Sequence, residues 1–181
     1  MELHELIGLT NYEHSDKVSK ISKMMAEEAG YSEREAGIVR QAALFHDIGK
    51  NAIPAEIINK PGKLTGDEYA MVKQHTEIGY RQIMDAIQIL ELAAIIARQH
   101  HERWDGKGYV GNVSGEEIHP YARLVSVADV FEALVSRRVY KPAWDMNEAF
   151  QYMCDNAGKQ FDGEFVDVLL QISGKVAQMY R

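Results

Sequence analysis

Apolar residues recur every three or four positions along most of the chain, which is the spacing of one face of an α-helix. The first predicted helix has apolar positions at Val18, Ile21 and Met25. Ser15 is expected to cap its N-terminus, and Gly30 is expected to end it. The chain therefore begins with a helix that buries one face.

Two further helix starts are marked by a Ser or Thr followed three residues later by Glu, the pattern of a capping box. One box begins at Ser32 and opens the helix that leads into "ALFHD". The other begins at Thr65 and is expected to open one continuous helix that passes through His75 and reaches Ile83. The stretch "KPGKLTG" between them reads as a connection.

The second half of the chain is also predicted to be helical. Ile87–Gln99 is apolar almost all round, which is typical of a central buried helix. Pro120 suits the first turn of the next long helix, and Asp145 and Asp162 can cap the last two. Because no alternation of period two is sustained, the predicted fold is all-α: a helical bundle in which residues 1–181 form a single domain.

Composition narrows the class of protein. The net charge is −7, which does not favour binding of duplex nucleic acid. The apolar runs are too short to cross a bilayer, so no membrane association is expected. Cys154 is the only cysteine, which excludes an internal disulfide and favours a reducing, cytoplasmic location. We interpret Cys154 as a helix-packing residue.

Histidines and aspartates gather at the ends of the apolar segments. His46 and Asp47 follow the second helix, His75 lies beside apolar residues, and His100–His101 follow the most apolar segment. Asp129 is surrounded by apolar neighbours, so we expect it to be buried. One histidine on an apolar face is usually a core residue, but two adjacent pairs and a buried carboxylate favour a metal site. Imidazole with carboxylate suits Fe, Mn, Co, Ni or Zn.

Six strings in order carry a family resemblance: "HDIGK", "KPGKLT", "HTEIGY", "HHERWDGKGY", "ARLVSVADVFEAL" and "SRRVYK". Together they resemble the HD-GYP family, a branch of the HD-domain metal-dependent phosphohydrolases, over nearly the whole chain. The resemblance implies the helical bundle of the HD superfamily. It also implies a cytoplasmic phosphodiesterase that hydrolyses the second messenger cyclic di-GMP at a binuclear metal site.

The resemblance also implies the ligands of that site. Carried over position by position, seven residues match metal ligands of the family, and Asp47 would bridge the two ions: His14, His46, Asp47, His75, His100, His101 and Asp129. The implied cofactors are two divalent transition-metal ions, Fe or Mn first, with Ni, Co or Zn as alternatives. The remaining histidines, His4 and His119, match no ligand, and we interpret them as surface residues.

Four further residues match positions that act on the substrate. Lys50 is expected to lie close to the scissile phosphate. Together with Asp47, which is also a ligand, it forms the expected catalytic pair. Arg138 and Lys141 match the basic pair that holds a substrate phosphate. Tyr109, in the signature loop, is expected to stack on the nucleotide or to hydrogen-bond near it.

The chain departs from the family pattern at several positions. Val110 replaces the proline of the signature loop, which is therefore expected to be less rigid. Val139 replaces a proline in "RRVYK", whose basic residues are intact, and Lys17 stands where arginine is usual. Members with three metals carry a glutamate one helical turn before the early histidine. Here that position is Thr10, which predicts two metals.

Other functions stay open from the sequence. One is hydrolysis of another cyclic or linear dinucleotide, to which Val110 gives weight. Another is a degenerate module that binds a cyclic dinucleotide without turnover, against which the complete ligand set argues. A sensor or receiver domain as partner, a homodimer, and the final product of hydrolysis are also left open.

Overall fold

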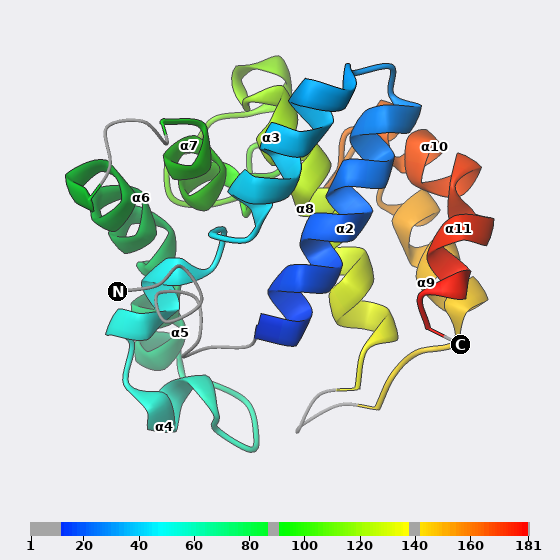
Figure 1. Cartoon of the computed structure of the whole chain (residues 1–181). Coiled ribbons are helices and arrows are strands. Elements are labelled where there is room, and N and C mark those ends of the chain that lie inside the picture. The colour runs from blue at the N-terminus through cyan, green and yellow to red at the C-terminus, as the bar shows by residue number, and fades with distance from the viewer. Residues whose placement is uncertain (1–11, 87–90, 138–141, 181) are drawn as a thin grey trace.

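Figure 1 shows the computed structural model, which describes residues 12–86, 91–137 and 142–180. Within these ranges the regular structure is helical, apart from an isolated bridge between Ala157 and Phe161. The prediction of an all-α fold is confirmed. None of the described helices combines the length and apolar character needed to cross a bilayer. That the whole chain forms one domain stays a prediction.

Most of the helices follow one another through short connections, but a long loop that contains η2 joins α7 to α8. In chain order they are α2 (Tyr12–Glu28), α3 (Glu33–Ala43), the 3₁₀ turn η1 (Ile48–Ala52), α4 (Ala55–Ile58), α5 (Gly66–Lys73), α6 (His75–Ala86), α7 (Glu91–Gln99), η2 (Gly115–Glu117), α8 (Pro120–Val135), α9 (Met146–Asp155), α10 (Gly163–Gln171) and α11 (Ser173–Gln178).

Helix α8 lies at the centre of the molecule and contacts α2, α7, α9 and α10 (Figure 1). Helix α2 packs along both α3 and α8, while α6 packs against α7 and η1. Helices α9, α10 and α11 cover the opposite side from α4, α5 and α6. This arrangement brings the ends of α3 and α7 close to the middle of α8.

The core forms where these helices meet. Ile21 and Met25 of α2 are fully buried, as is Phe131 of α8, whose ring stacks on Phe150 at 4.8 Å between centroids. Aromatic and aliphatic burial of this kind supplies most of the stabilisation of a helical bundle. In α7, Ala93, Ala94, Ile96 and Ala97 are buried, while Leu92 and Ile95 are only partly buried, so the segment is less completely buried than predicted.

Most predicted helix boundaries are confirmed. The capping boxes at Ser32 and Thr65 are both formed, and Asp145 and Asp162 each accept a backbone N–H at the start of α9 and α10. Pro120 occupies the first turn of α8. Gly30 follows the end of α2 with a φ of +84°, a conformation that suits glycine.

Other boundaries differ from the prediction. Ser15 lies inside α2 and is buried, because the helix has already begun at Tyr12. The helix expected from Thr65 to Ile83 ends at Lys73, and a new helix begins at His75. The helix that Asp162 caps ends at Gln171, before the short α11.

Cys154 is exposed on α9, so its interpretation as a packing residue is wrong. Apolar positions predict the buried face of a helix well, but a lone cysteine carries no such periodic signal.

Close packing of η1 on α6 depends on Gly49. A Cβ atom at this position would lie 1.9 Å from the carbonyl oxygen of His75 and 2.6 Å from the amide nitrogen of Gly79. Only glycine allows the two backbones to approach so closely. The turn that carries His46 and Asp47 is thereby held against the start of α6.

Candidate metal centre

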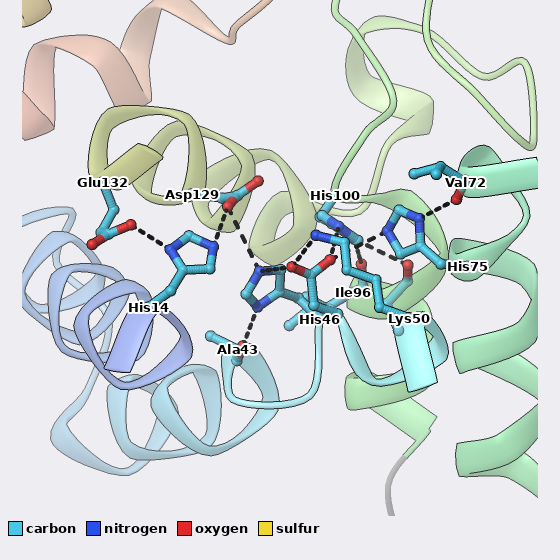
Figure 2. Close-up of polar contacts among 12 residues, drawn as sticks. His14, Ala43, His46, Lys50, Val72, His75, Ile96, His100, Asp129 and Glu132 are labelled. Atoms are coloured by element: carbon cyan, nitrogen blue, oxygen red, sulfur yellow. Dashed lines mark hydrogen bonds and ion pairs between the residues drawn. The ribbon is translucent and has the colours of Figure 1, made fainter. Parts of the chain in front are cut away.

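Seven histidines and aspartates from five parts of the chain converge in the interior. They form two groups, in each of which the nearest ligand atoms lie within 4.8 Å of one another: Asp47, His75, His100 and His101 in one, and His14, His46 and Asp129 in the other. We call the first the open group and the second the inner group. Figure 2 shows His14, His46, Asp129, His75 and His100 pointing toward this shared region.

Each side chain belongs to a helix or to the residues directly after one. His46 and Asp47 lie in the turn between α3 and η1, and His75 is the first residue of α6. His100 and His101 follow α7 directly. His14 and Asp129 face each other from α2 and α8. All seven predicted ligands are therefore brought together, although they are spread over more than 100 positions of the sequence.

Three of the imidazoles are oriented by backbone carbonyls. Each contacts, through Nδ1, the carbonyl oxygen three residues earlier: His46 to Ala43 at 2.7 Å, His75 to Val72 at 2.7 Å and His100 to Ala97 at 3.0 Å. Because a carbonyl can only accept, these contacts place the proton on Nδ1. The Nε2 lone pairs then point inward, as metal ligation by histidine requires.

The inward-facing atoms lack hydrogen bonds. The Nε2 atoms of His46, His75 and His100 and Oδ1 of Asp47 are buried without a hydrogen-bond partner among the described residues. Burying unsatisfied polar atoms is costly, and several at one point are rare in a stable fold. Divalent transition-metal ions, one in each group, would satisfy these atoms, so the donor set fits such ions.

Asp47 lies between the two groups. Its Oδ1 is 3.3 Å from Nε2 of His75 and 3.7 Å from Nε2 of His100, in the open group. Its Oδ2 is 3.4 Å from Nε2 of His46, in the inner group. Lys50 also donates to Oδ2 from the first turn of η1. One carboxylate thus presents an oxygen to each group.

The inner group contains a contact that the sequence analysis missed. Oδ1 of Asp129 lies 3.0 Å from Nε2 of His14, while Nδ1 of the same ring contacts the carboxylate of Glu132 (Figure 2). Glu132 is 1% exposed. It follows Asp129 by three residues, so both lie on one face of α8. A second acidic residue within an apolar helix was the signal that could have found it.

Electrostatics keep the carboxylates ionised. Burial acts to raise the pKa of Asp47, but Lys50 and His46 outweigh it and hold that pKa well below its ordinary value. The same balance holds for Asp129, where His14 and His46 outweigh burial. An ionised carboxylate is the form that binds a metal ion.

The histidines of the two groups differ in basicity. Burial lowers the pKa of His100 and, more strongly, that of His101, which keeps both rings neutral. Burial also acts to lower the pKa of His46, but Asp47 and Asp129 outweigh it and raise this pKa to about 10. A metal ion in the inner group would therefore have to displace a proton from Nε2 of His46, while the Nδ1 proton stays hydrogen-bonded to the carbonyl of Ala43.

A loop covers the open group. The ring of Tyr109 lies 5.0 Å from that of His101, and the peptide bond from Tyr109 to Val110 is cis. The loop is fixed by Glu102, whose buried carboxylate accepts the N–H of Gly111. Burial raises the pKa of the Tyr109 phenol, so its hydroxyl remains a donor.

Some predicted residues cannot be placed. Arg138, Lys141 and Val139 lie outside the described residues, as do Thr10 and His4.

His119 is placed, and it is only half-buried on the surface. Its Nδ1 accepts the N–H of Tyr121 at 3.2 Å and so caps α8. The interpretation as a plain surface residue is therefore incomplete.

Comparison with known proteins agrees with this geometry. A family model described as HD domain matches residues 5–165. The cyclic di-GMP phosphodiesterase response regulator RpfG of Xanthomonas campestris is 43% identical over 91% of this chain and 44% of its own length. The 3′3′-cGAMP-specific phosphodiesterase 2 of Vibrio cholerae is 35% identical over 87% of this chain and 30% of its own length. The chain thus spans less than half of both relatives.

The fold also matches a solved structure. Bd1817, an HDG"Y"P protein from Bdellovibrio bacteriovorus, has a TM-score of 0.73 and 22% identity over 95% of this chain and 54% of its own. At this identity the likeness bears on the fold alone. Because the family model covers most of the sequence, the chain belongs to the HD domain family, as its motifs predict.

Proposed function

We propose that this chain is a metal-dependent phosphodiesterase that hydrolyses cyclic di-GMP. The observation that carries the proposal is the position of Asp47, whose two oxygens face two separate groups of histidines. This is the arrangement of a carboxylate that bridges two ions. The activity named for the relative RpfG supports cyclic di-GMP as the substrate.

In this proposal two divalent ions are held, one by each group. His75, His100 and His101 would hold one ion, His14, His46 and Asp129 would hold the other, and Asp47 would bridge them. Iron or manganese suits this mixture of imidazole and carboxylate best, and Ni, Co or Zn are alternatives. Bound divalent ions supply Lewis acidity toward the phosphate and lower the pKa of a nearby water.

Side chains of the protein would then position the substrate and neutralise the negative charge of its phosphate. Lys50, half-buried beside Asp47, places a cation next to the proposed bridge. From there it can stabilise negative charge on a phosphoryl oxygen or protonate the leaving sugar oxygen. Tyr109, whose ring lies beside that of His101, would present its ring and its hydroxyl to the nucleotide.

Arg138 and Lys141 are proposed to hold the phosphate that is not cleaved. Arginine binds a phosphate through two parallel N–H groups, and lysine acts as a point charge. Replacing either by alanine should raise KM more than it lowers kcat, because uniform binding is lost.

The proposed setting is the cytoplasm, since one cysteine in 181 residues is typical of a reducing compartment. A sensor or receiver domain is a proposed partner, because RpfG is a response regulator that is longer than the matched region. Self-association into a homodimer belongs to the same set of proposals.

The cyclic dinucleotide 3′3′-cGAMP is the second candidate substrate, because one relative at 35% identity is named for it. A binding module without turnover is less well supported, since all seven ligand positions are filled and converge.

The proposal is tested by incubating the purified chain, loaded with Mn²⁺ or Fe²⁺, with cyclic di-GMP and separating the products by chromatography. We expect a linear dinucleotide or GMP to form, and turnover to stop when a chelator is added. Stoichiometric binding of cyclic di-GMP without product in either metal would contradict the proposed hydrolysis and favour a binding module.

A further inference from the structure

A cavity of about 450 Å³ lies beside the open group. Its lining includes His101 and Tyr109, Ser126 and Val130 of α8, and Tyr69 of α5. Because His101 belongs to the open group, the cavity leads directly to the candidate metal centre. A ligand whose phosphate reaches the metal centre would therefore place its neighbouring sugar or base in this cavity.

Tyr69 does not serve the core. It is 49% exposed, and none of the side chains of α5 is buried. Its ring meets that of Tyr109 edge-on, at 6.5 Å between centroids. A large aromatic side chain is thus held at the edge of the cavity, with about half of its surface available for contact with a flat ligand.

Lys73 lies one helical turn after Tyr69, on the same face of α5. Its Nζ is 5.2 Å from the centre of the Tyr69 ring and 5.8 Å from the centre of the Tyr109 ring. The two basic residues in the lining of the cavity, Arg103 and Lys107, both contact Asp105. No ion pair joins Lys73 to a carboxylate of the described residues, so its charge is available to a ligand.

Two aromatic rings with a cationic donor over them suit a purine that carries acceptors on one side. Guanine presents the acceptors O6 and N7 there, which lysine and arginine recognise. Adenine presents an amino donor in place of O6, which faces an ammonium group unfavourably. Stacking on the aromatic rings serves any base.

We propose that Tyr69 and Lys73 form a guanine-recognition subsite, in which Tyr69 stacks on one base of the substrate and Lys73 reads its O6 and N7. This inference rests on the proposed function for the class of substrate. It adds the helix α5, which supplies no candidate metal ligand, as the element that selects guanine over adenine.

The experiment compares the intact chain with Lys73→Met, Tyr69→Ala and Tyr69→Phe. Dissociation constants for GMP and AMP are measured by calorimetry, and kcat/KM is measured for cyclic di-GMP and cyclic di-AMP. Lys63→Met, an exposed lysine in the connection before α5, is the matched control. Thermal unfolding of each variant checks that these substitutions, at the exposed Tyr69 and the half-buried Lys73, leave the fold intact.

Lys73→Met should weaken GMP binding and lower kcat/KM for cyclic di-GMP by about 10-fold, with little change for the adenine ligands. Tyr69→Ala should weaken both bases by about 10-fold, and Tyr69→Phe should not. Lys63→Met should match the wild type.

The outcomes separate this inference from the proposed function. If the wild type hydrolyses cyclic di-GMP but Lys73→Met keeps the full preference for guanine, the subsite is wrong and the function stands. If neither dinucleotide is hydrolysed but the preference for GMP depends on Lys73, the subsite stands and the proposed function fails. A wild type that binds GMP and AMP equally, or neither, overturns the subsite.

Discussion

The open and inner groups use the same kinds of side chain but are supported differently. In the open group, His75 and His100 are oriented by backbone carbonyls. In the inner group, His46 is held in the same way by the carbonyl of Ala43, but His14 is oriented by the carboxylate of Glu132. A carbonyl contact is built into the helix and survives any substitution of its neighbour, whereas the Glu132 contact can be removed by one mutation. The geometry of the inner group is therefore the easier of the two to change by mutation.

Access differs as well. Every member of the inner group is buried, while His101 of the open group is partly exposed and lines the cavity beneath Tyr109. Lys50 reaches the boundary between the groups at Asp47. A cavity lined by His101 and Tyr109 adjoins the open group, and a second cavity, lined by His14 and Glu132, adjoins the inner group.

The largest effect is expected where the two groups meet. Asp47→Ala removes the oxygens that face both groups, so turnover should fall to background and bound metal should be lost. Circular dichroism should still show the helices. Asp167→Ala, an exposed aspartate on α10, is the matched control and should keep full activity. Wild-type turnover in Asp47→Ala would remove the proposed bridge.

Lys50→Ala tests the charge beside the bridge. We expect kcat to fall by about 10- to 100-fold with little change in KM, because a charge-assisted contact of about 1.5–3 kcal/mol is lost in the transition state. Lys20→Ala, an exposed lysine on α2 that pairs with Asp16, controls for loss of surface charge. An unchanged kcat in Lys50→Ala would exclude Lys50 from the chemistry.

Glu132→Gln separates the groups. Loss of the carboxylate behind His14 should weaken metal binding in the inner group by about 10- to 100-fold and leave the open group unchanged. Titration with Mn²⁺ should then show one tight and one weakened site. Glu148→Gln on the exposed face of α9 is the control. Equal weakening of both sites would show that Glu132 does not act through His14.

Gly49→Ala acts on the support of the open group. The new Cβ would collide with the backbone of His75, so the free energy of unfolding should fall by about 1–3 kcal/mol. In Gly37→Ala, in α3, the new Cβ would have no atom within 4 Å, so the free energy of unfolding should rise by about 0.5–1 kcal/mol. Denaturant unfolding measures both. A neutral Gly49→Ala would mean that η1 and α6 can separate without cost.

The sequence predicted much of this architecture, for reasons that are local. Capping boxes at Ser32 and Thr65 and the cap at Asp162 depend only on residues within one turn, and all three are formed. The break between α5 and α6 was missed, because it depends on where His75 must point and not on the helical pattern around it. Helix boundaries set by tertiary contacts are invisible to a periodicity argument.

The candidate site was predicted at the level of ligands but not of their support. Histidine–aspartate pairs and family motifs pointed to the seven converging residues. Glu132, Tyr69 and Lys73 were missed, because their importance arises from neighbours far away in sequence, such as His14 and Tyr109. Such contacts follow only once the helices are placed in space.

The most direct test of two groups bridged by Asp47 is the number of metal ions per chain. Protein purified without chelator and reconstituted with Mn²⁺ or Fe²⁺ is analysed by elemental analysis together with anomalous diffraction. The account predicts two ions, one between His75, His100 and His101 and one between His14, His46 and Asp129, with Asp47 shared. Three fully occupied sites, or a single ion that leaves either group empty, would contradict it.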